Sequence, residues 1–401
     1  FTLRQPYAQF LDNATLGILP KHVWKDVPID EFSFSDFNIS GPGSGPYEIT
    51  VAEKSSAGIP NYYKLDAFKD FSLGRAYIET MYLRFFGNEE LLVDALRSGA
   101  VTNANSLSPQ EVVTLRNRSG IQVKNFVLPR VYGIFFNQSS ADVFTEYAVR
   151  KALSQAVNRK EIVDTVLFGY GIPLYGPLPK SGDSLGGVIG NENVDHILEA
   201  RKTLEQAGWK YSEADKLMVK TVKKATSTIS VSVSTADRPE LRETLALVRS
   251  SWEKLGIKVE EKIYEAGDLS QNVIRPRKYD ALLFGEIIGR DTDPFAFWHS
   301  SQRNDPGLNI ALYANSTVDK ILETARVTLD ATERAQKYAD FEAEVARDIP
   351  AVFLYSPEFI YVLSKDIQGM DAGELTLSAE RFLNVYEWYI DTDYIWKIFN
   401  K

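Results

Sequence analysis

The chain has 401 residues, of which 44% are hydrophobic and 25% charged, and its formal net charge is −9 at pH 7. A chain of this length is expected to form two or three domains. The acidic balance argues against a nucleic-acid partner, because nucleic-acid-binding surfaces carry an excess of basic residues. The sequence contains no cysteine, which excludes disulfides, thiolate metal sites and cysteine catalysis.

The beginning of the chain shows no targeting pattern. Its first residue is Phe1, and neither a signal peptide nor a run of 18 apolar residues follows. We expect the chain to begin inside a longer protein, so that any export signal or lipid anchor would lie outside it. Further on, the Pro- and Gly-rich segment 41–47 predicts a turn.

Local signals predict alternating strands and helices along the chain. Asn88 is a predicted N-cap and Gly99 a predicted C-terminal stop of one helix, and Ser108-Pro109 open another. Apolar residues at helical or alternating spacing mark further elements. The expected strands are 77–86, 132–137, 279–284, 351–355 and 358–363, and the expected helices are 89–98, 108–118, 145–160, 195–207, 317–328 and 333–347.

The clearest supersecondary signal lies between residues 227 and 263. Ile229, Val231 and Val233 alternate with polar residues, as in a half-buried strand. Pro239 opens a helix that Gly256 ends, and a second strand follows to Ile263. A strand, a helix and a strand within about 35 residues predict a βαβ unit with parallel pairing. The fold class is therefore α/β.

The order of several motifs resembles that of the extracellular solute-binding proteins of peptide ABC transporters, the dipeptide and oligopeptide-binding proteins of bacterial family 5. Gly43-Ser44-Gly45-Pro46-Tyr47 is similar to a recurring turn of that family, and 149–159 is similar to its most distinctive block. No single motif is specific, but their colinear order covers almost the whole chain. The other matching segments are 95–101, 135–137, 200–209, 255–259, 279–280 and 293–294.

This resemblance implies a two-lobed periplasmic-binding-protein-like fold of type II, with mixed sheets covered by helices and a two-strand hinge. On that mapping, residues 1–128 form part of lobe 1, residues 129–364 form the ligand-binding lobe 2, and residues 365–401 return to lobe 1. Family members have further residues before the segment that matches Phe1, so the chain is expected to lack its N-terminal part.

The resemblance also implies a function without covalent chemistry and without a cofactor. The chain is expected to capture short peptides outside the cytoplasm, in the periplasm or at the outer face of the membrane, and to deliver them to ABC transporter permease subunits. Membrane contact would come only through the permease or an N-terminal anchor. Other ligands on the same fold, such as a nickel chelate, an oligosaccharide or an opine, are the alternative, and a hydrolase is a further one.

The family holds the peptide's ammonium group with a buried carboxylate, because an ammonium group taken out of water needs an opposite charge. The matching segment here is 285–294, which begins at Gly285. Asp291 is the first candidate for the anchor. Asp293 is the second, although an aspartate before proline more often caps a turn. Glu286 is the third.

Four further residues are candidates for the ligand site, each with a structural alternative. Arg290 would meet a carboxylate or neutralise its acidic neighbours. Trp298 would line a side-chain pocket or pack on the core. Asn137 would reach the ligand or serve as a turn amide, and Tyr132 carries the same alternatives. No metal site is expected, since the three histidines are scattered.

Overall fold

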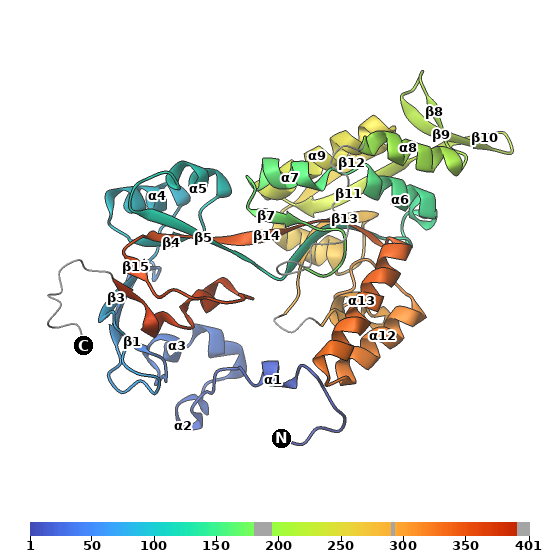
Figure 1. The fold of residues 1–401 in the computed structure, drawn as a ribbon. Helices are drawn as coiled ribbons and strands as arrows, with labels where there is room; N and C mark the ends of the chain where they lie inside the picture. Colours follow the sequence, from blue (N-terminus) through green and yellow to red (C-terminus); the bar gives the residue numbers. More distant parts are fainter. Residues whose placement is uncertain (180–194, 290–292, 391–401) are drawn as a thin grey trace. The chain divides into compact units, whose positions relative to one another are not determined.

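The computed structural model describes residues 1–179, 195–289 and 293–390. The chain forms two compact units (Figure 1). Unit 1 contains Phe1–Ala14 and Val127–Glu358, and unit 2 contains Thr15–Phe126 and Phe359–Lys401. The sequence-based division kept residues 1–128 together, whereas this one groups residues 1–14 with unit 1. The first segment joins that unit through Ala8, whose N–H donates to the carbonyl of Arg326 at 2.8 Å.

Unit 1 is built on a mixed sheet with the strand order β12-β11-β13-β6-β14, and β7 also pairs with β14. β11 and β12 are parallel and joined by a helix, which confirms the predicted βαβ unit. β6 is antiparallel to both β13 and β14. The strands are β6 (Arg130–Phe136), β7 (Gly171–Pro173), β11 (Ser230–Ala236), β12 (Lys258–Tyr264), β13 (Ala281–Ile287) and β14 (Ala351–Ser364).

Helices lie on both faces of this sheet (Figure 1). On one face, Trp252 of α9 donates its indole N–H to the carbonyl of Leu153 at 3.0 Å. On the other face, the fully buried Trp298 packs against Phe341 of α13 and Phe353 of β14. The helices are α6 (Tyr147–Gln155), α7 (Arg159–Val166), α8 (His196–Gln206), α9 (Pro239–Leu255), α11 (Phe295–Trp298), α12 (Ser316–Val327) and α13 (Ala331–Asp348).

The predicted single helix over 145–160 is wrong, because the chain forms α6 and α7 there. Asn158 caps α7 by accepting the N–H of Glu161 at 3.1 Å. Arg159, the first residue of α7, is buried and donates to the carbonyls of Leu174 and Phe353 at 2.9 and 2.7 Å. The break between the helices therefore aims a guanidinium group into the unit, where backbone carbonyls satisfy it.

Strand β14 is also longer than predicted. It runs without interruption from Ala351 to Ser364, where two strands were expected, and Pro357 lies within it. Its first part pairs in unit 1 with β6 and β7. Its last part pairs in unit 2 with β4 (Asn103–Asn105). One continuous strand thus carries the chain from unit 1 into unit 2.

Unit 2 contains a three-stranded sheet of β1 (Tyr47–Lys54), β2 (Pro60–Ala67) and β3 (Thr80–Arg84). The sequence predicted β3 but not the other two strands. Asn88 caps α4 (Glu89–Ser98) as expected, by accepting the N–H of Leu91. Unit 2 also contains α2 (Lys21–Trp24), α3 (Phe37–Ser40), α5 (Pro109–Leu115), β5 (Ile121–Val127) as far as Phe126, β15 (Ile367–Gln368) and β16 (Tyr389–Ile390). The short helix α1 (Phe10–Asn13) belongs to unit 1.

A second small sheet projects from unit 1 (Figure 1). It consists of β8 (Lys210–Ser212), β9 (Leu217–Val222) and β10 (Ala225–Thr228). In the part of the chain that the structure describes, no helix has both the length and the apolar character that a membrane span requires.

Candidate functional site

The segment that carries the predicted ligand site leaves the carboxyl end of β13. In α/β sheets, ligands bind beyond the carboxyl ends of the strands. Gly285, near the end of β13, lies beneath the ring of Tyr132 on β6, since a Cβ atom at this glycine would stand 2.8 Å from that ring. The ring of Tyr132 in turn stacks on that of Tyr355 at 5.2 Å. A side chain at position 285 would therefore push the ring of Tyr132 out of its place beside Tyr355.

Glu286, the third candidate anchor, is a buried carboxyl group. The residue is 2% exposed, and neither side-chain oxygen has a hydrogen-bond partner. Burial raises the pKa of Glu286 well above its usual range, and the Trp298 indole partly offsets that rise. The indole N–H acts on this carboxyl group from outside good hydrogen-bond geometry, and it has no other hydrogen-bond partner among the described residues. This acid therefore prefers its neutral form, and no cation among the described residues balances it.

Asp293, the second candidate, already has a cation. Its Oδ2 accepts a hydrogen bond from Nε of Arg326 at 2.9 Å and forms an ion pair with a terminal nitrogen of the same guanidinium group at 2.8 Å. Its Oδ1 accepts the backbone N–H of Phe295 at 3.1 Å. The guanidinium group also lies 3.8 Å from the centre of the Phe295 ring. The contact with the Phe295 N–H matches the turn-capping alternative for Asp293. The negative charge of Asp293 is balanced by Arg326 within unit 1.

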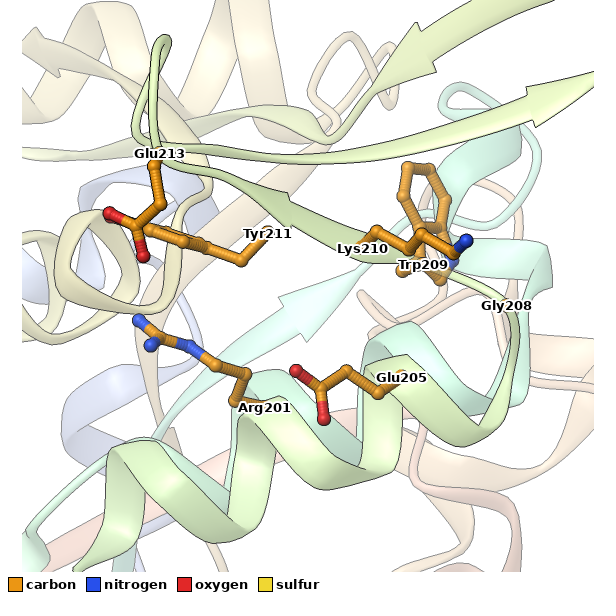
Figure 2. Close-up of a pocket in the computed structure, with 7 residues that line it drawn as sticks. All are labelled: Arg201, Glu205, Gly208, Trp209, Lys210, Tyr211 and Glu213. Atoms are coloured by element: carbon orange, nitrogen blue, oxygen red, sulfur yellow. The ribbon is translucent and has the colours of Figure 1, made fainter.

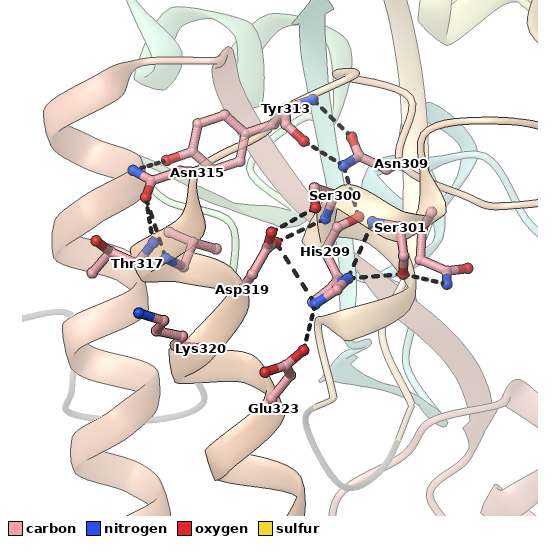
Figure 3. A network of polar contacts seen from close by, with 12 residues as sticks. His299, Ser300, Ser301, Asn309, Tyr313, Asn315, Thr317, Asp319, Lys320 and Glu323 are labelled. Atoms are coloured by element: carbon pink, nitrogen blue, oxygen red, sulfur yellow. Dashed lines mark hydrogen bonds and ion pairs between the residues drawn. The ribbon is translucent and has the colours of Figure 1, made fainter.

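A polar network connects His299 and Ser300, which follow α11, to α12 (Figure 3). The ring of His299 stacks on that of Phe295 at 4.1 Å, and its Nδ1 accepts the backbone N–H of Ser301 at 3.1 Å. Its Nε2 faces Glu323 at 3.4 Å and Asp319 at 3.8 Å. Asp319 also accepts the N–H of Ser300 at 2.8 Å. These contacts hold the residues that follow the candidate segment against α12.

Two further candidates have structural contacts. The side-chain N–H groups of Asn137 donate to the carbonyls of Arg277 and Tyr279, and its Oδ1 accepts two backbone N–H groups of the next turn. The turn-amide alternative therefore describes these contacts. Trp298 belongs to the core of unit 1, as its packing alternative expected. Arg290 and Asp291 lie outside the described residues.

Unit 1 also contains a pocket, and Figure 2 shows the residues that line it. It has a volume of about 500 Å³ and lies between α8 and β8. Tyr211 in its wall packs 3.0 Å from where a Cβ atom of Gly256 would stand, and Gly256 precedes β12. The pocket is thus at the amino end of that strand, away from the predicted ligand segment. Its lining is Arg201, Glu205, Gly208, Trp209, Lys210, Tyr211 and Glu213.

The described residues hold no cluster of three or more histidine, aspartate and glutamate side chains that suits a metal ion. Sequence reasoning missed Tyr355 and Arg326, both of which contact predicted site residues. The apolar run 351–355 predicted a strand that contains Tyr355, but nothing in the sequence paired this residue with Tyr132. Nor did spacing relate Arg326 to Asp293, because 33 residues separate them.

Comparisons with known proteins agree on one family. The sequence model described as "Bacterial extracellular solute-binding proteins, family 5 Middle" matches residues 1–308. The oligopeptide-binding protein AppA of Bacillus subtilis is 28% identical over 376 residues, which cover 92% of this chain and 67% of that protein. Protein XP55 of Streptomyces lividans is 30% identical over 383 residues, which cover 92% of this chain and 65% of XP55.

A solved structure shows the same likeness. The structure of the Bacillus subtilis oligopeptide-binding protein AppA in complex with a nonapeptide has a TM-score of 0.68 and 26% identity, and the match covers 98% of this chain and 76% of that one. The chain spans about two thirds of the length of the curated relatives it matches. The family match over most of the chain and the shared fold lead to one conclusion: the chain belongs to family 5 of the bacterial extracellular solute-binding proteins.

Proposed function

We propose that the chain is the ligand-binding component of an ABC importer and that it captures short peptides. The observation that carries the proposal is its likeness to the Bacillus subtilis oligopeptide-binding protein, whose solved complex holds a nonapeptide. Backbone hydrogen bonds hold an extended peptide without reading its sequence, which suits the uptake of mixed peptides. The captured peptide then passes to permease subunits of the transporter, and the chain performs no covalent chemistry on it.

The family's extracellular setting supports an extracytoplasmic location for this chain. The proposed place of action is the periplasm or the outer face of the cell membrane. The chain contacts the membrane through the permease or through an anchor outside these 401 residues.

The proposed binding region is the segment that leaves β13, with Tyr132 and Gly285 beside it. Among its three acidic residues, Asp291 is the proposed partner of the peptide's ammonium group. The charge of Asp293 is already matched by Arg326. Glu286 is buried and prefers its neutral form. A neutral carboxyl group forms a much weaker hydrogen bond with an ammonium group than a carboxylate does.

Isothermal titration calorimetry with short peptides of mixed sequence tests the proposal. Peptides with a free N-terminus should bind, and their N-acetylated forms should bind at least about tenfold more weakly, since one charge-assisted hydrogen bond contributes about 1.5–3 kcal/mol. Asp291→Asn should remove that preference, whereas Asp293→Asn should keep it. An Asp291→Asn protein that binds the free peptide as tightly as the wild type does, and still prefers it over the N-acetylated form, would refute the anchor assignment.

The same samples test the proposed class of protein. Peptide recovered intact after a long incubation with the chain supports a binding protein, and a cleaved peptide would indicate a hydrolase. Tight binding of a nickel chelate or an oligosaccharide, with no peptide bound, would replace the proposed ligand and keep the family.

A further inference from the structure

The small sheet of β8, β9 and β10 carries positive charge in an acidic chain. No aspartate or glutamate occurs between Asp215 and Asp237, although the chain has 54 acidic residues and a net charge of −9. The same stretch contains four lysines, of which Lys220 pairs with Glu146 at 2.9 Å. The three that are exposed and form no ion pair with any described residue are Lys216, Lys223 and Lys224. We call residues 216–228 the lysine hairpin.

The backbone of the lysine hairpin turns at lysines where its geometry favours other residues. Val222 pairs with Ala225, so Lys223 and Lys224 form a two-residue loop with φ angles of 48° and 76°. Asparagine and glycine are the usual residues of such a loop, because a Cβ atom disfavours the left-handed region. Lys216, before β9, is also left-handed, with a φ of 56°. Non-glycine residues in this region concentrate at functional sites, and here turn geometry does not explain the choice of lysine.

The other side chains at the tip of the lysine hairpin suit a phosphate-rich surface. β10 is the edge strand of its sheet, and all of its residues are exposed. The hydroxyl groups of Thr221 and Thr226 meet across the two strands at 3.1 Å. Val222, beside the loop, is 57% exposed. Lysine attracts phosphate as a point charge and hydroxyl groups donate hydrogen bonds to it, while an exposed apolar side chain enters the headgroup region.

The place of the lysine hairpin in the fold lets it act apart from the rest of the chain. The small sheet projects from unit 1 (Figure 1), and at physiological ionic strength exposed charges more than about 8 Å apart are largely screened from one another. The net charge of −9 therefore does not cancel the attraction of the exposed lysines for an anionic surface.

We propose that the lysine hairpin docks the chain on a membrane surface that contains anionic phospholipids. The proposal rests on the outer-face location given under the proposed function and not on the peptide ligand. It adds a direct contact with lipid to the permease and the anchor named there.

Vesicle co-sedimentation tests this proposal. Large unilamellar vesicles of equal parts phosphatidylglycerol and phosphatidylcholine are compared with vesicles of phosphatidylcholine alone. In about 50 mM salt the chain should bind the anionic vesicles and not the neutral ones, and about 500 mM salt should abolish most of that binding because it screens the charges.

A double variant separates the charge of the loop from its shape. Lys223→Asn/Lys224→Gly removes two charges and installs the residues that this loop favours, so the thermal midpoint should stay the same or rise. Binding to the anionic vesicles should fall by at least about tenfold, since one lysine near an anionic surface contributes about fivefold. Lys223→Arg/Lys224→Arg keeps the charge and should keep the binding.

A charge-matched control shows whether the position of the lysines matters. Lys320→Gln/Lys365→Gln removes the same charge from two exposed lysines outside the hairpin and should change vesicle binding by less than about twofold. Calorimetry with short peptides should give the wild-type affinity for every variant. A failure of lipid docking is therefore distinguished from a failure of the proposed peptide binding.

Three results would overturn the proposal. The first is no binding to the anionic vesicles at low salt. The second is equal binding of the wild type and of Lys223→Asn/Lys224→Gly. The third is hairpin-dependent binding only to vesicles that carry permease subunits, because the partner would then be an acidic protein surface.

Discussion

Replacement of Glu286 by methionine should stabilise the protein. The two side chains are similar in length, and the carboxyl group is buried with no hydrogen-bond partner for either oxygen. A buried polar group without a partner costs about 1–3 kcal/mol. We therefore expect Glu286→Met to raise the free energy of unfolding by about that amount at neutral pH.

The stability gained by Glu286→Met should depend on pH, and the direction follows from the pKa of Glu286. Burial raises the pKa of Glu286 in the folded protein above its value in the unfolded chain. The folded protein then holds this proton more tightly, so the contribution of Glu286 to stability is complete at low pH. It is lost as the pH rises through the folded-state pKa, where the buried group must ionise. The advantage of Glu286→Met should therefore grow from acidic to alkaline pH.

Urea unfolding between pH 5 and pH 9 measures both effects. Glu260→Met is the matched control, because Glu260 lies on β12 with 66% of its side chain exposed. This control should change the free energy of unfolding by less than about 0.5 kcal/mol. A Glu286→Met protein that is less stable than the wild type at every pH would refute the reasoning, since it would show that the carboxylate has a stabilising partner.

Three more variants test individual contacts. Arg159→Lys should lower the free energy of unfolding by about 3–5 kcal/mol in urea, because lysine cannot reach the several carbonyls that the buried guanidinium group satisfies; a loss below about 1 kcal/mol would contradict this role. Asn137→Ala should lower the free energy of unfolding by about 2–3 kcal/mol and leave peptide affinity unchanged. A loss of affinity measured by calorimetry, with wild-type stability, would instead favour the ligand role. Asp293→Asn should lower the thermal midpoint by a few degrees, because Arg326 loses its carboxylate, and an unchanged midpoint would show that the ion pair contributes nothing.

The βαβ unit could be predicted because its signals are local. Alternation in the strand, Pro239 at the helix start and Gly256 at its end each act within a few residues. The single helix predicted over 145–160 failed for a tertiary reason. Its apolar spacing continues past Gln155, but Asn158 caps a new helix there, and the guanidinium group of Arg159 donates to buried carbonyls of Leu174 and of β14.

The candidate site was only partly accessible to sequence reasoning. Glu286 was named as an acid of the predicted ligand segment, but its burial is a tertiary effect that the local sequence does not show. Asp293 was the second candidate anchor, and its turn-capping alternative could be named because that contact is local. Its ion pair with Arg326 joins residues 33 positions apart, which no spacing rule predicts.

The central claim, capture of short peptides, is tested most directly by native mass spectrometry of the protein purified from its own host. Denaturation of that sample, followed by sequencing of whatever is released, identifies the ligand. The account predicts a set of short peptides of varied sequence, bound one per protein molecule. Release of a non-peptide ligand from the complete gene product, with no peptide among the released molecules, would contradict it.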